Sequence, residues 1–71
     1  MKSDLQLTRE RIAAARGRLV RAWCACELAA KRDDITADVL RLHEQELGWA
    51  MAVASEHGLD PQTVLIAEGA L

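Results

Sequence analysis

The chain has 71 residues, of which 51% are hydrophobic and 28% charged, and its net charge is −2. This length makes one domain, whose core usually contributes only ~3–5 kcal/mol of stability. No apolar run approaches the ~20 residues that a membrane-spanning helix needs, which excludes a membrane protein. The two cysteines, Cys24 and Cys26, would point about 200° apart on a helix and cannot pair within it. Free thiols and the lack of a recognisable signal peptide predict a reducing, cytoplasmic setting.

The small net charge conceals a strong asymmetry between the two halves of the chain. Residues 1–32 hold eight Lys and Arg and three acidic residues, a net charge of +5. Residues 33–71 hold one Arg and eight acidic residues, a net charge of −7. The halves should attract each other, either within one chain or between two. Exposed ion pairs give only ~0–1 kcal/mol each, so charge selects pairing and orientation more than it stabilises.

The first predicted helix covers residues 4–32. Ser3 and Gln6, three residues apart, fit a capping box at its start. Along this helix large residues recur every seven positions and alanines fall at the half-steps, so both rows lie on one face. The alanines permit close approach of another helix, in a hairpin or a dimer. The predicted seam consists of Leu5, Ile12, Ala15, Leu19, Ala22, Trp23, Cys26 and Ala29, with Trp49 from the second helix.

The second predicted helix covers residues 36–57. Its apolar residues span about 200° of the helical wheel, which is more than one neighbouring helix can cover. His43 and Glu46 lie inside this apolar sector. We expect them to pair with each other, or Glu46 to pair with Arg9 or Arg16 of the first helix, because buried charges are usually paired. A ligand-binding or proton-transfer pair is the less favoured interpretation.

A third helix is predicted for residues 61–68. Gly58 is a strong helix stop, and Asp60 and Pro61 have the residue types of an N-cap and a first helical position. The predicted fold is therefore all-α: a long antiparallel helical hairpin with a short third helix, forming a single domain over residues 1–71. Self-association into a dimeric helical bundle is the natural way for so short a chain to bury its apolar surface.

The segment from residue 50 to residue 69 resembles the helix-turn-helix motif of DNA-binding regulators. The positions that carry this resemblance are the small, turn and apolar positions Ala54, Gly58, Leu59 and Val64. The resemblance implies a pair of helices joined by a short turn, and DNA binding through the second of them. Recognition of bases needs Arg, Lys, Asn or Gln, of which the outward positions supply only Gln62, and the surrounding acidic half would repel phosphate.

Two surfaces are candidates for binding a partner. One is an apolar C-terminal end, predicted to consist of Leu65, Ile66 and Leu71, because exposed apolar clusters usually mark contact sites. The other is a basic ridge on the first helix, formed by Arg11, Arg18 and Arg21 with Arg32 nearby. This ridge could bind nucleic acid or an acidic protein, or pair with the acidic half of the chain.

No set of catalytic groups and no phosphate-binding loop is recognisable, so we expect no enzyme activity and no cofactor. Cys24, Cys26, His43 and His57 are poorly spaced for zinc, so no metal site is predicted, and the cysteines are expected to be small core residues. The preferred hypothesis is a small protein–protein interaction module, a homodimeric regulator or inhibitor that binds a larger protein. The alternative is a nucleic-acid-binding regulator that uses the helix-turn-helix-like segment or the basic ridge.

Overall fold

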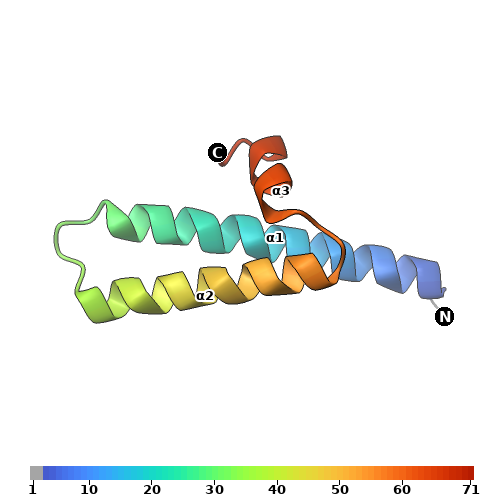
Figure 1. Cartoon of the computed structure of the whole chain (residues 1–71), viewed down its shortest axis with the longest axis horizontal. Coiled ribbons are helices and arrows are strands. Elements are labelled where there is room, and N and C mark those ends of the chain that lie inside the picture. The colour runs from blue at the N-terminus through green and yellow to red at the C-terminus, as the bar shows by residue number, and fades with distance from the viewer. Residues whose placement is uncertain (1–2) are drawn as a thin grey trace.

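A computed structural model describes residues 3–71 and shows three helices within them: α1 (Asp4–Ala30), α2 (Ala37–Glu56) and α3 (Pro61–Ala67). The prediction of an all-α chain is confirmed. The predicted helices of residues 4–32, 36–57 and 61–68 differ from the observed ones by two residues or fewer at each end. Helices α1 and α2 lie side by side and run in opposite directions, and α3 packs against this pair (Figure 1).

The helix starts follow from the residues that precede them. The Ser3 hydroxyl accepts a hydrogen bond from the backbone N–H of Gln6 at 3.2 Å, which satisfies one of the unpaired N–H groups of the first turn. Thr36 caps α2 in the same way. Asp60 occupies the N-cap position of α3 but makes no side-chain bond to the backbone. Its carboxylate instead accepts a hydrogen bond from the Thr63 hydroxyl at 2.6 Å.

Glycines end the second and third helices. Gly58 has a φ of +78°, a backbone conformation that is unfavourable in free energy for any residue with a Cβ atom. The backbone N–H of the next residue, Leu59, donates to the carbonyl of Ala54 at 2.9 Å. Gly69 has a φ of +74°, and the N–H that follows it donates to the carbonyl of Leu65 at 2.8 Å. Both glycines turn the chain sharply and fix where α3 begins and ends.

The core lies where the three helices meet and consists mostly of small side chains. Among residues 3–71, only Leu19 and Leu65 are large and fully buried. Alanines at the contact allow the axes of α1 and α2 to approach closely. The buried residues are Ala15, Leu19, Ala22 and Ala29 of α1, Ala50 and Ala54 of α2, and Val64 and Leu65 of α3.

The position of Leu65 corrects the predicted C-terminal contact surface. Leu65 was predicted to face outward, yet it is only 1% exposed and packs in the core cluster. The reason is that α3 needs an apolar side of its own to dock on the helix pair, and its adjacent Val64 and Leu65 provide it. Ile66 is left outward and is 57% exposed.

Several residues of the predicted seam are not buried between α1 and α2. Trp49 is 70% exposed and Leu5 is 62% exposed, so neither is buried between α1 and α2 of one chain, and their place in a seam between two copies stays a prediction. Leu5 is exposed because the first turns of α1 extend past the end of α2 (Figure 1). Of the remaining seam residues, Ile12, Trp23 and Cys26 are half-buried. Cys24, which was not part of the seam but was expected in the core, is exposed.

Candidate interaction surface

Within residues 3–71, α3 packs against one side of the pair of α1 and α2 (Figure 1). On the covered side, Val20 and Trp23 of α1 and Leu47 and Met51 of α2 pack against the core cluster that contains Val64 and Leu65. On the other side Leu42 and Trp49 of α2 are 63% and 70% exposed. We call this second side the open face. It comprises Arg18, Arg21 and Ala25 of α1 and Leu42, His43, Glu46 and Trp49 of α2.

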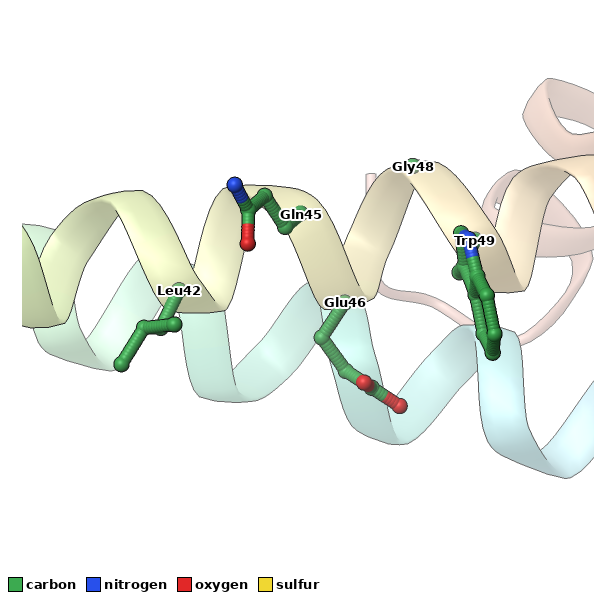
Figure 2. A pocket seen from close by; sticks show the side chains of 5 residues that line it. All are labelled: Leu42, Gln45, Glu46, Gly48 and Trp49. Atoms are coloured by element: carbon green, nitrogen blue, oxygen red, sulfur yellow. The ribbon is translucent and has the colours of Figure 1, made fainter.

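The exposed residues of α2 form one stripe along the helix. Leu42, Glu46 and Trp49 are spaced by four and three positions, which places their side chains on one side of a helix. Figure 2 shows the three side chains projecting from the same side of α2, with Gln45 and Gly48 above them. These five residues line an open depression on the surface. The stripe therefore offers apolar contacts at both ends and a carboxylate between them.

Arg18 links the two halves of the open face. Its Nη2 donates to the Glu46 carboxylate at 3.0 Å, and its guanidinium carbon lies 5.9 Å from the centroid of the Trp49 ring. An exposed ion pair contributes about 0–1 kcal/mol and an exposed cation–π contact about 0.5–1 kcal/mol, so these contacts orient more than they stabilise. Their consequence is that Trp49 is exposed but restrained.

The ion pair of Glu46 also corrects a predicted pairing. Arg9 and Arg16 were the expected partners of Glu46 on α1, and His43 was the other candidate. The antiparallel packing of α1 and α2 instead places Glu46 opposite Arg18, while Arg16 points to the covered side and pairs with Glu68 at 2.9 Å. Arg16 thus helps to hold α3 in place.

A second depression runs between the two helices next to the first. It is lined by Arg18, Arg21, Ala22 and Ala25 of α1 and by His43 and Glu46 of α2. The open face is therefore continuous across α1 and α2. Its α1 edge is basic because of Arg18 and Arg21, and the α2 edge carries the carboxylate and the large apolar side chains.

The predicted basic ridge does not form one uniform surface. Arg11 and Arg21 are exposed on α1, whereas Arg18 is engaged with Glu46 and Trp49. Arg32 lies beyond the end of α1 and forms two hydrogen bonds with the Asp34 carboxylate, at 3.0 and 3.1 Å. The guanidinium of Arg32 lowers the pKa of Asp34 below its usual value. Two of the four arginines are thus already paired within the chain.

The C-terminal apolar end consists of Ile66 and Leu71, each 57% exposed, without Leu65. It is anchored by Trp23, whose indole N–H donates to the carbonyl of Ala70 at 3.2 Å. This contact joins the second half of α1 to Ala70. The apolar end is therefore held by the covered side, apart from the open face.

The segment that resembles a helix-turn-helix motif has its small and apolar positions inside the fold. Ala54 and Val64 are buried and Leu59 is half-buried. On α3 the exposed side chains include Gln62, Thr63 and Ile66, none of which is charged. The resemblance is thus expressed in packing, while α3 itself presents no cation to phosphate.

The sequence predicted the seam on α1 but missed the open face as a site. In the sequence, the signal for this face was the apolar sector of α2, which is too wide for one neighbouring helix to cover. It contains two parallel rows, one with Leu47, Ala50 and Ala54 that packs inward, and a second with Leu42 and Trp49 that stays exposed.

A scan against protein-family models and searches of curated proteins and solved structures find no match for this chain. Within residues 3–71, no helix is long and apolar enough to cross a membrane. In the same residues, no group of three or more His, Cys, Asp or Glu side chains is placed to hold a metal ion. The functional conclusion therefore rests on the surface of the chain itself.

Proposed function

We propose that this protein is a non-enzymatic protein–protein interaction module, a homodimeric regulator or inhibitor that binds a larger protein. Two separate apolar surfaces support this proposal. One is the open face with Leu42 and Trp49, and the other is the C-terminal apolar end of Ile66 and Leu71. A dimer that binds a target needs two such surfaces, one for the second copy and one for the target.

The observation that carries the proposal is the exposure of Trp49. Its side chain is 70% exposed although the chain has only two tryptophans and few large core residues. Tryptophan and arginine are enriched among the residues that dominate binding energy at protein interfaces. Because the Arg18 guanidinium lies over the ring, Trp49 has already lost part of the side-chain freedom that binding would otherwise remove. A restrained, exposed tryptophan is the arrangement expected of an interface anchor.

Capture from the native cell, using immobilised chain, tests the proposal. We expect a defined protein to be retained by the wild type and lost with Ile66→Asp at the apolar end. Gln62→Glu, an exposed change on the same helix, is the matched control and should retain the protein.

Binding to random duplex DNA and to RNA is measured in parallel by salt-dependent mobility shift. Micromolar binding that falls steeply with salt and disappears in Arg11→Glu/Arg21→Glu would overturn the proposal in favour of a nucleic-acid-binding regulator. Retention of the same protein by the wild type and Ile66→Asp would remove the apolar end from the proposed site.

A further inference from the structure

We infer that the open face is occupied by a second copy of this chain, with α1 of each copy lying against α2 of the other. This inference rests on the proposed function, because it takes the open face to be an interaction surface. It specifies which surface forms the dimer and how the two copies are oriented. The apolar end with Ile66 and Leu71 then stays available for a different protein.

Charge distinguishes between the two symmetric ways of placing the open faces together. With a two-fold axis perpendicular to the helices, α1 would lie on α1 and α2 on α2, and like charges would meet. With the axis parallel to the helices, α1 lies on α2 of the other copy. The half of the chain that contains α1 has a net charge of +5 and the half that contains α2 has −7, so the parallel axis is favoured. Like charges brought together across an interface are costly, whereas opposite charges fix orientation.

The ion pair within the chain fixes the position along the helix axes at which the charges of the two copies meet, and we call this position the height. Arg18 and Glu46 lie side by side on neighbouring helices, 3.0 Å apart. Rotation about an axis parallel to the helices keeps every residue at its own height. The second copy therefore brings its own Arg18 and Glu46 to the same level, and positive and negative groups alternate around the four helices. Each Glu46 gains a second arginine without meeting another carboxylate.

The apolar residues on either side of this charged layer meet small residues. Because α1 and α2 are antiparallel, Trp49, three residues after Glu46, lies at the height of residues just before Arg18. Ala14 is exposed there and lies one helical turn before Arg18, on the same side of α1. In the other direction, Leu42 lies at the height of Arg21 and the buried Ala22, one helical turn from the half-buried Ala25, and these residues of α1 line the depression between the helices. Trp49 thus faces the small Ala14, and Leu42 faces the space between Arg21 and the small Ala25, so helices of the two copies can approach closely.

Sedimentation measures whether this face forms the dimer. We expect the wild type to have twice the 7.8 kDa mass of the chain at micromolar concentration. Trp49→Glu should raise the dissociation constant of the dimer about 30-fold or more, as loss of an interface anchor does. Because Trp49 is 70% exposed in the single chain, the variant should keep its helical circular dichroism. Ala14→Arg, which fills the space proposed for the tryptophan of the second copy, should have the same effect, and Ile66→Glu should not.

Disulfide trapping tests the orientation. Because Arg18 lies opposite Glu46 on antiparallel helices, Ala25 of α1 lies at the height of Val39 of α2, which is 44% exposed. Ala25→Cys and Val39→Cys are therefore made separately in a chain in which Cys24 and Cys26 are replaced by serine, and the two variants are mixed. If α1 lies on α2 of the second copy, the mixed disulfide should form faster than either homodimeric one. Predominant Ala25→Cys homodimers would overturn the orientation.

The outcomes separate this inference from the proposed function. A wild type that stays monomeric, or a Trp49→Glu variant that remains dimeric, overturns the inference, because neither is compatible with a second copy on this face. A monomeric wild type also removes the dimer from the proposed function, whereas the proposed binding of a larger protein is judged separately, by capture with the wild type and loss with Ile66→Asp.

Discussion

Leu65 and Ile66 are adjacent residues that should respond very differently to truncation. Leu65 is 1% exposed and is, with Leu19, among the largest fully buried side chains, whereas Ile66 is 57% exposed. Removing three buried carbons costs roughly 2.4 kcal/mol at ~0.8 kcal/mol per methylene, and the cavity left behind brings Leu→Ala changes to ~2–5 kcal/mol. A core of this size contributes only ~3–5 kcal/mol in total. Leu65→Ala should therefore remove roughly 40% or more of the free energy of unfolding.

Urea unfolding followed by circular dichroism measures this difference, at one fixed protein concentration because self-association would shift the midpoint. Ile66→Ala is the matched control and should cost less than about 1 kcal/mol, since surface changes are usually small. The NMR signal of the Trp23 indole N–H, which donates to the carbonyl of Ala70, reports separately on the docking of the last residues. Equal losses for the two variants would show that α3 does not dock through Leu65, and would refute the proposed orientation of this helix.

Two further predictions follow from single residues. Gly48→Ala should raise the free energy of unfolding by about 0.5–1 kcal/mol, because Gly48 is inside α2 and a Cβ atom there would meet nothing within 4 Å. Gly58→Ala, at a φ of +78°, should instead lower the free energy of unfolding by about 1–2 kcal/mol. Thermal unfolding measures both changes, and two changes in the same direction would contradict this reasoning. Arg32→Gln should raise the pKa of Asp34 towards its ordinary value in an NMR carboxyl titration, with the exposed Arg41→Gln as control. Since the Asp34 pKa is lower in the folded chain, this pair stabilises above the unfolded pKa, and its small effect is lost as the pH falls through the folded pKa.

The local signals in the sequence were strong enough to predict the helices. Ser3 before the first apolar repeat, Gly58 after the second, and Pro61 at the start of the third determine where helices begin and end, because capping and backbone conformation depend on neighbouring residues. The seven-residue repeat likewise placed Ala15, Leu19 and Ala22 together on the face of α1 that is now buried. These features depend on a few residues at a time, and sequence alone contains that information.

The sequence could not determine which apolar row of a wide sector faces inward. On α2, the row with Ala50 and Ala54 packs against α1 because small side chains permit the closest approach of the two axes, and this choice leaves Trp49 outside. On α3, only docking on the helix pair decides that Leu65 is buried and Ile66 exposed.

The sequence by itself thus determined the helices, their ends and the opposite charges of the two halves, all of which follow from neighbouring residues or from composition. The tertiary structure alone decided that Arg18 meets Glu46 and Trp49, and that one side of the helix pair is left uncovered. The physical reason is that both depend on the relative height and rotation of α1 and α2, which are fixed when all contacts between the helices are satisfied together.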